Sequence, residues 1–187
     1  MGIFRRGGET HALAVAMTAV KLGDRLLQIG CTDASIVAAI CSKVGMSGRA
    51  CALISSEADG ARARSGAERG GFLLEIEKSS LNNFPYPDHS FDVIVVDNQN
   101  GLIANARPDE RVAILQQARR TLAPRGRIVV IERAPRTGLG ALLGTGPPVD
   151  PHYQGSGGAV AALKAEGFKA VRQLAERNGL SFFEGIG

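Results

Sequence analysis

FPYPDHSFDVIVVD, residues 84–97, is the stretch that decides the fold of this chain. It begins with a proline-rich turn, Phe84–Asp88, and continues into a strand-like apolar run that ends at Asp97. An apolar run bounded by turn signals is typical of a strand buried on both faces, as at the centre of a parallel sheet. Because ligands of open α/β sheets bind at the carboxyl ends of such strands, Asp97 and the loop after it are predicted to face a pocket.

On both sides of this stretch, predicted strands alternate with predicted helices. The expected strands are Arg25–Gly30, Ala50–Ser55, Leu73–Glu77, Phe91–Asp97, Arg127–Glu132, Lys169–Arg177 and Leu180–Gly185. The expected helices are His11–Lys21 with Thr10 as its cap, Ala34–Val44, Glu57–Arg69, Pro108–Leu122 and Ala159–Glu166. This order predicts right-handed βαβ units and a doubly wound, mostly parallel α/β sheet. The turn Asn178-Gly179 closes it with a hairpin, which is expected to put an antiparallel strand on the edge.

Length and composition suit one globular domain. At 187 residues, with 44% apolar and 21% charged residues, the chain is long enough for a substantial core. We expect a single domain over residues 1–187, with a helical lead-in over 1–22 and a flexible Gly/Pro-rich segment over 133–158. No apolar run is long enough to span a bilayer, and no signal-peptide cleavage pattern is present, so we expect a cytoplasmic protein.

Charge and cysteine spacing favour neither a nucleic-acid site nor a metal site. The net charge is +4, but the positive residues are scattered and almost no aromatic residues lie among them. This pattern is typical of a solvated surface. The cysteines Cys31, Cys41 and Cys51 lie ten residues apart, which fits neither metal-ligand spacing nor a disulfide framework, so reduced thiols are expected.

Three motifs resemble those of the class I S-adenosylmethionine-dependent methyltransferases, in particular the type 11 group. Leu26–Cys31 is similar to the family's first motif, Val-Leu-Asp-x-Gly-Cys-Gly-x-Gly. Phe84–Asp97 is similar to Leu-Pro-Phe-x-Asp-x-Ser-Phe-Asp-Val-Val, and Leu115–Arg127 to Leu-x-x-x-x-Arg-x-Leu-Lys-Pro-Gly-Gly-x. The resemblance covers roughly residues 21–186. It implies the Rossmann-like, seven-stranded methyltransferase sheet with a C-terminal antiparallel hairpin.

The resemblance also implies S-adenosylmethionine as the cofactor and a set of residues that would contact it. Those that match the family's contact positions are Gln28, Gly30, Cys31, Thr32, Asp33, Ile54, Ser55, Ser80, Leu81 and Asp97. The sequence singles out no catalytic residue. Three of these residues have alternative interpretations. Gly30 either lets the cofactor approach or only makes a tight turn. Cys31 is either a reactive thiol at a helix N-terminus or a packed residue. Asp97 either orients a ligand or caps the following loop.

The cofactor motifs differ from the family at three acidic positions. Gln28 replaces the acid that helps to hold the amino-acid end, Ile54 the acid that accepts the ribose hydroxyls, and Ser80 an acid that often meets the adenine amino group. A hydrogen bond to a charged group contributes about 1.5–3 kcal/mol, so losing two carboxylates costs about 3–6 kcal/mol unless others replace them. Asp33, near the ammonium group, and Glu57, near the ribose, are the candidate replacements.

Two functions follow from this comparison. The first is a diverged S-adenosylmethionine-dependent methyltransferase that acts on a small molecule, and Gly30, Asp33 and Asp97 favour it. The alternative is a non-catalytic protein of the methyltransferase fold that works through protein contacts, including a homo-oligomer, and the replaced acids favour it. A nicotinamide dehydrogenase ranks third, because the first turn lacks the G-x-G-x-x-G pattern.

Overall fold

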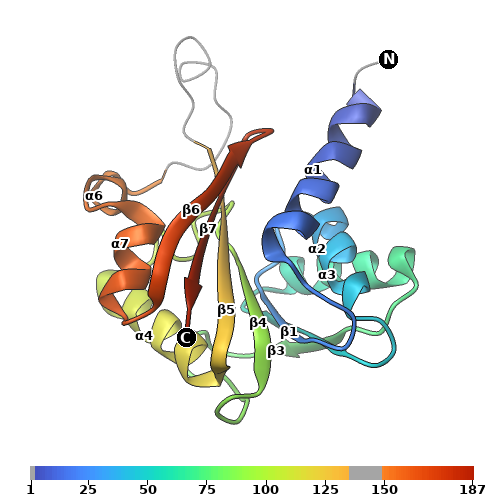
Figure 1. Ribbon diagram of the computed structural model, residues 1–187, viewed down its shortest axis with the longest axis horizontal. Helices are drawn as coiled ribbons and strands as arrows, with labels where there is room; N and C mark the ends of the chain where they lie inside the picture. Colours follow the sequence, from blue (N-terminus) through green and yellow to red (C-terminus); the bar gives the residue numbers. More distant parts are fainter. Residues whose placement is uncertain (1–2, 135–148) are drawn as a thin grey trace.

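The computed structural model describes residues 3–134 and 149–187, with side chains from Gly8 onward. Its centre is a seven-stranded sheet in the order β3-β2-β1-β4-β5-β7-β6 (Figure 1). The strands are β1 Arg25–Ile29, β2 Arg49–Ile54, β3 Glu75–Lys78, β4 Phe91–Asp97, β5 Leu122–Arg133, β6 Lys169–Arg177 and β7 Leu180–Ile186. The helices are α1 Ile3–Thr18, α2 Ala34–Cys41, the 3-10 turn η1 Ser42–Val44, α3 Glu57–Gly70, α4 Pro108–Thr121, α6 Pro151–Gly155 and α7 Gly158–Ala165.

The pairing of the strands confirms a doubly wound, mostly parallel sheet. Strands β3, β2, β1, β4 and β5 pair in parallel, and β7 is antiparallel to both β5 and β6. The antiparallel strand was expected at the edge of the sheet, and this is wrong by one position in the strand order. After the hairpin turns, it is β7 that returns onto β5, so β6 is left as the edge strand.

Residues of the central strands alternate between two cores because side chains of a strand point to opposite faces in turn. On β4, Val93 and Val95 belong to the core beneath α1, α2 and α3. Their neighbours Ile94 and Val96 belong to the core beneath α4 and α7. Figure 1 shows these two groups of helices on opposite sides of the sheet. Cover on both faces is the physical reason for the uninterrupted apolar run.

Several element boundaries differ from those that the sequence predicts. Helix α1 begins at Ile3, so Thr10 lies inside the helix and is not its cap. Strand β3 begins two residues late, and Leu73 before it is 84% exposed. Strand β5 begins at Leu122, because the expected turn over Pro124-Arg125-Gly126 is a bulge within the strand, where Arg125 has φ +64°. Propensity does not locate these ends, since tertiary pairing decides them.

The segment 133–158 is not without structure. It contains helix α6 and the start of α7, while residues 135–148 lie outside the described part of the chain. None of the helices in the described ranges is long and apolar enough to cross a membrane. Because β1, β2, β4 and β5 run parallel, their carboxyl ends share one edge of the sheet. That edge holds the candidate site.

Candidate functional site

The turn after β1 favours glycine because of its backbone conformation, and it packs closely against the end of β4. Gly30 has φ +75°, a conformation that residues with a Cβ rarely adopt. A Cβ built on Gly30 would lie 2.7 Å from Leu102 Cδ1 and 3.4 Å from the carbonyl oxygen of Asp97. The turn therefore lies against the end of β4, in a cradle that any larger residue would fill.

Asp97 connects the ends of β1 and β4. Its side chain is buried; Oδ2 accepts a hydrogen bond of 2.6 Å from the Thr32 backbone N–H. Oδ1 accepts hydrogen bonds of 3.2 Å from the backbone N–H and from Nε2 of Gln99. Burial raises the pKa of the Asp97 carboxyl, and the bonds from Thr32 and Gln99 oppose this rise. Asp97 thus caps its own loop, as one interpretation has it, and in addition holds the β1 turn in place.

A crevice of about 290 Å³ lies between the carboxyl ends of β1, β2 and β4. Arg62 of helix α3 lies across this crevice. Its Nε donates a 2.6 Å hydrogen bond to the carbonyl oxygen of Cys31, and its Nη2 pairs with the carboxylate of Asp59. Asp59 and Arg62 both line the crevice, with side chains 18% and 39% exposed. An ion pair therefore occupies the wall on the α3 side.

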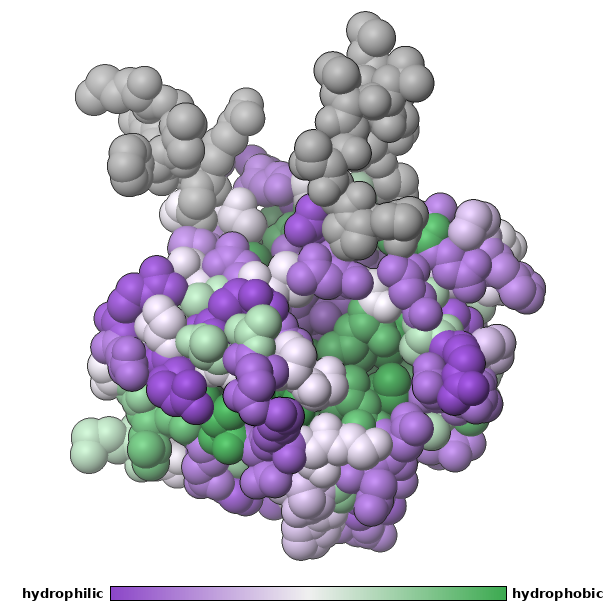
Figure 2. Space-filling model, turned by 180° about the vertical axis from the view of Figure 1, so that it is seen from behind, coloured by the Kyte–Doolittle hydropathy of each residue, from purple (hydrophilic) through white to green (hydrophobic). Residues whose placement is uncertain are grey.

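A wider hollow adjoins the crevice. It has a volume of about 650 Å³ and lies between the end of β3 and the start of α4. Ser55 and Leu102 line both spaces, so the hollow and the crevice are adjacent. Figure 2 shows the face of the molecule opposite to that of Figure 1, where a hollowed area of hydrophobic surface is surrounded by mostly hydrophilic surface. The combined space could hold an extended ligand with a flat apolar part.

Most of the cofactor contacts expected from the sequence lie on these two walls. The crevice is lined by Gly30, Cys31, Thr32, Ser55 and Asp97, and the hollow by Ser55, Ser80 and Leu81.

Two of the expected residues serve the fold instead. Asp33 is the N-cap of α2, where its Oδ1 accepts hydrogen bonds from the backbone N–H groups of Ser35 and Ile36. Ile54 is buried at the end of β2. Neither lines the crevice or the hollow.

Gln28 lies behind the turn and is 1% exposed. Its Nε2 donates a 3.0 Å hydrogen bond to the Gly30 carbonyl oxygen. Its Oε1 is buried and has no hydrogen-bond partner among the described residues. A buried acceptor without a partner is costly, and Gln28 lines neither the crevice nor the hollow, so its role in the described structure is to support the turn.

The structure supports one of the two interpretations of Cys31 and does not support Glu57 as a replacement acid. Burial, with help from the nearby Asp97, raises the pKa of the Cys31 thiol to about 12, so it is a packed thiol and not a reactive one. Glu57 is 82% exposed and pairs with Lys78, outside the crevice. Asp59, two residues later on α3, is the acid that lines it. The signal that could have identified Asp59 is its i, i+3 spacing from Arg62 directly after β2.

A second polar cluster lies at the carboxyl end of β5. Glu132 Oε1 accepts hydrogen bonds from the Tyr153 hydroxyl (2.6 Å) and from Asn98 Nδ2 (2.7 Å). Burial raises the pKa of Glu132, and these two hydrogen bonds partly oppose the rise. Glu132, Tyr153 and Asn98 line a second hollow of about 420 Å³ at the end of β5, which is distinct from the hollow between β3 and α4. The sequence signal for Glu132 is its place at the end of the apolar strand β5, which corresponds to the place of Asp97 at the end of β4.

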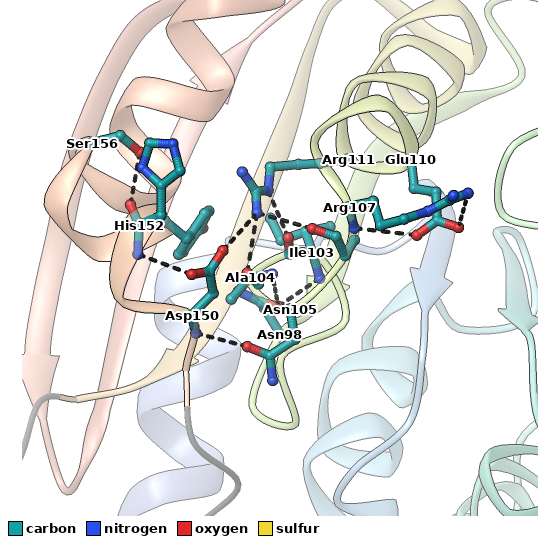
Figure 3. A network of polar contacts seen from close by, with 12 residues as sticks. Asn98, Ile103, Ala104, Asn105, Arg107, Glu110, Arg111, Asp150, His152 and Ser156 are labelled. Atoms are coloured by element: carbon teal, nitrogen blue, oxygen red, sulfur yellow. Dashed lines mark hydrogen bonds and ion pairs between the residues drawn. The ribbon is translucent and has the colours of Figure 1, made fainter.

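Arg111 of α4 fixes the loop that follows β4. Its guanidinium donates to the carbonyl oxygens of Ile103 (2.7 Å), Ala104 (3.1 Å) and Ala106 (3.1 Å). It also lies 4.7 Å from the centre of the Tyr153 ring, a cation–π contact. Figure 3 shows Arg111 between this loop and the segment that carries Asp150 and His152. The wall of the second hollow is therefore held from three elements.

Comparison with known proteins places this geometry in a family. The model of a methyltransferase domain matches residues 26–126. No curated protein matches the sequence at a significant level.

Solved structures share the fold at low sequence identity. An S-adenosylmethionine-dependent methyltransferase from Aquifex aeolicus is 19% identical, with a TM-score of 0.72 over 94% of this chain and 88% of its own. The [4+2]-cyclase SpnF is 16% identical, with a TM-score of 0.67 over 95% of this chain and 79% of its own. A complex between the Trm112 methyltransferase activator and a methyltransferase of Haloferax volcanii gives 16% identity and a TM-score of 0.65, over 99% of this chain and 91% of that one.

The sheet order, the glycine turn beside the end of β4 and the match over more than half of the chain agree with one another. The chain belongs to the methyltransferase-domain family.

Proposed function

We propose that this protein is an S-adenosylmethionine-dependent methyltransferase that acts on a small molecule, with the cofactor in the crevice between β1, β2 and β4. The observation that carries the proposal is the hydrogen bond from the Thr32 backbone N–H to the buried Asp97 carboxylate. This bond holds the end of β4 against the Gly30 turn. It so forms a cradle in which the protein main chain at Gly30 would lie close to a ligand. Bound S-adenosylmethionine would supply an electrophilic methyl group.

The residues present are compatible with this cofactor. Gln28 is 1% exposed and does not line the crevice, so it supports the Gly30 turn from behind and we assign it no direct contact with the cofactor. Asp59 is a carboxylate for the ribose hydroxyls, in place of the acid that the family has at the position of Ile54. Leu81 and Leu102 supply apolar surface in the adjoining hollow. The proposed set of contacts in the crevice therefore keeps Gly30, Thr32 and Asp97 and adds Asp59.

Arg62 is the group that has to yield. Its guanidinium pairs with Asp59 and binds the Cys31 carbonyl oxygen, so it competes with a ligand for both. The side chain is 39% exposed, and a rotation into solvent breaks an ion pair of modest strength. In the bound state the residues of the crevice position the methyl group and exclude water, and we assign no proton transfer to them.

The alternative is a non-catalytic family member that acts through protein contacts. The Asp59–Arg62 pair and the closeness of Leu102 to Gly30 favour it, because both groups narrow the crevice. The Haloferax volcanii neighbour, solved with an activator protein, shows that one protein of this fold has a protein partner. A partner of this kind, or a second copy of the chain, would be the functional ligand in that case.

Calorimetry separates the two functions. If the crevice is a working cofactor site, S-adenosylhomocysteine and S-adenosylmethionine will bind with Kd below about 100 μM, or about −5.5 kcal/mol. No heat at millimolar ligand would remove the enzyme function and leave the alternative.

A matched pair of variants tests the role of Asp59. Asp59→Asn should weaken S-adenosylhomocysteine binding by about 10- to 100-fold, because a hydrogen bond to a charged group is lost. Glu57→Gln changes an acid of the same helix that points to solvent and should leave the affinity within about twofold. Equal effects of the two variants would show that Asp59 does not contact the ligand.

A further inference from the structure

The cluster around Glu132 contains a carboxylate whose charge is not neutralised within the described structure. Both of its hydrogen bonds come from neutral donors, Tyr153 and Asn98, and both end on Oε1. Among the side chains of residues 8–134 and 149–187, no lysine, arginine or histidine forms an ion pair with Glu132. Partial removal of a carboxylate from water without a cation is unfavourable, and the raised pKa of Glu132 expresses that cost.

This carboxylate lines a hollow with both polar and apolar walls. Ala104, Ala159 and Phe183 form apolar wall, and Glu176 supplies a second, exposed carboxylate. Arg133 lines the same hollow, yet it forms no ion pair with either acid among the described contacts. The space suits a small ligand that combines an apolar body with a positively charged or hydrogen-bond-donating group.

The carboxylate is held in place from both sides. The Asn98 side chain cannot reverse, because its Oδ1 accepts hydrogen bonds from the backbone N–H groups of Ile103 (2.8 Å) and Ala104 (3.1 Å). Its Nδ2 must therefore point at Glu132. Tyr153 is 2% exposed and lies beneath the Arg111 guanidinium. A rigid carboxylate loses little freedom when a ligand binds, so little of the interaction energy is spent on ordering it.

Three consecutive residues connect this hollow with the crevice. Asp97 lines the crevice, whereas Asn98 and Gln99 line the hollow. Gln99 donates from Nε2 and from its backbone N–H to Asp97. The two spaces thus lie on opposite sides of one short wall at the end of β4, as a cofactor and an acceptor must.

We propose that the hollow at the end of β5 is the acceptor site and that it takes a small amine on an apolar body, with Glu132 recognising the ammonium group. The role of the amine as methyl acceptor rests on the proposed function, whereas binding of the amine in the hollow does not. An ammonium group gives Glu132 the cationic partner that the described chain lacks, and an anionic ligand of the same shape would be repelled.

Three ligands of one shape and different charge test the proposal on the native protein. The probes are 2-phenylethylamine, 2-phenylethanol and 3-phenylpropionate, followed by ligand-observed NMR titration with and without S-adenosylhomocysteine. The amine should bind about tenfold or more tightly than the alcohol, and the carboxylate should bind more weakly than the alcohol. Equal binding of amine and alcohol would overturn the proposal, and so would tighter binding of the carboxylate.

Two variants place the preference on one residue. Glu132→Gln keeps the shape and the acceptor for Tyr153 but removes the charge, and it should reduce the tenfold preference to about twofold or less. Glu176→Gln, on the exposed part of the same wall, should keep the preference. A Glu132→Gln protein that folds and retains the preference would sink the assignment to Glu132. If Glu132→Gln does not fold, the three-ligand comparison on native protein still decides.

Binding of S-adenosylhomocysteine is the independent readout. It should be unchanged in Glu132→Gln, because Glu132 does not line the crevice. Amine preference without any S-adenosylhomocysteine binding would refute the proposed function and leave the amine site standing. The reverse result would keep the methyltransferase function and refute the amine as the recognised class.

Discussion

The crevice after β1 and the hollow after β5 lie on the same edge of the sheet but differ in the partners of their acidic side chains. In the crevice, Asp59 pairs with Arg62, and Asp97 is bound by backbone N–H groups. In the hollow, Glu132 has only neutral donors among its described partners. A ligand that uses Asp59 would compete with Arg62 for it in the crevice, whereas a cationic ligand would form an ion pair with Glu132 in the hollow.

The largest expected effect comes from removing the support of the hollow. Arg111→Ala deletes three hydrogen bonds to carbonyl oxygens and the cation–π contact with Tyr153, so we expect a loss of about 2–4 kcal/mol in the free energy of unfolding. Urea unfolding measures it. Arg107→Ala removes a cation at the N-cap of the same helix, where the side chain is 71% exposed, and should cost less than about 1 kcal/mol. Similar losses for both would mean that the loop after β4 does not depend on Arg111.

A glycine substitution tests the crevice in the same way. Gly30→Ala forces a Cβ into a left-handed backbone conformation and against Leu102, so we expect a loss of about 2 kcal/mol in stability. Binding of S-adenosylhomocysteine should weaken by about tenfold or more.

The matched control is Gly71→Ala at the end of α3. Gly71 has φ +62°, but no atom lies within 4 Å of a Cβ built there. It should lose about 1 kcal/mol from backbone strain alone and bind the ligand normally. Calorimetry and thermal unfolding give both numbers. A Gly30→Ala protein that binds as well as Gly71→Ala would show that the cradle is only a tight turn.

Amine binding in the hollow should also depend on pH, through Glu132. Burial raises the pKa of Glu132, so the apo protein is stabilised by the protonated form below the unfolded-state pKa, and this contribution is lost as the pH rises through the folded-state pKa. An ammonium ligand needs the ionised form. Its affinity should therefore fall about tenfold for each pH unit below the pKa of Glu132, and the fall should begin at a higher pH than for an ordinary glutamate.

The neighbours of Glu132 must be separated from it in this experiment. Glu176 and Arg133 line the same hollow, and Tyr153 binds Glu132 directly; burial raises the pKa of Tyr153 far above the range of the titration. NMR titration of 2-phenylethylamine at several pH values should give the sloping profile in native protein and in Glu176→Gln, and a flat one in Glu132→Gln. A slope that survives in Glu132→Gln would assign the titration to another group.

The fold was predictable because its signals are local. The apolar run of β4 and the turn Asn178-Gly179 each mark an element within a few residues. Both turn residues have positive φ, 55° and 76°, as a tight hairpin of this hand requires. The ends of α1, β3 and β5 were not predictable, because they depend on pairing with residues distant in the sequence.

Part of the crevice was predictable for the same reason. Gly30 follows its strand directly, and Asp97 ends the apolar run, so both are visible as single positions. The candidate roles of three other residues can be recognised only from contacts in the folded chain. These residues are Asp59, Glu132 and Tyr153. Tyr153 follows Glu132 by 21 positions and reaches it only because α6 docks on the end of β5.

By itself, the sequence determined the alternation of strands and helices, the glycine turn and the place of Asp97 at the end of β4, since periodicity and backbone conformation are properties of neighbouring residues. Only the tertiary structure decided which charges meet. Arg62 reaches Asp59 and the Cys31 carbonyl across the crevice, while Glu132 meets neutral partners, and electrostatic energy depends on distances in space that separation along the chain does not specify.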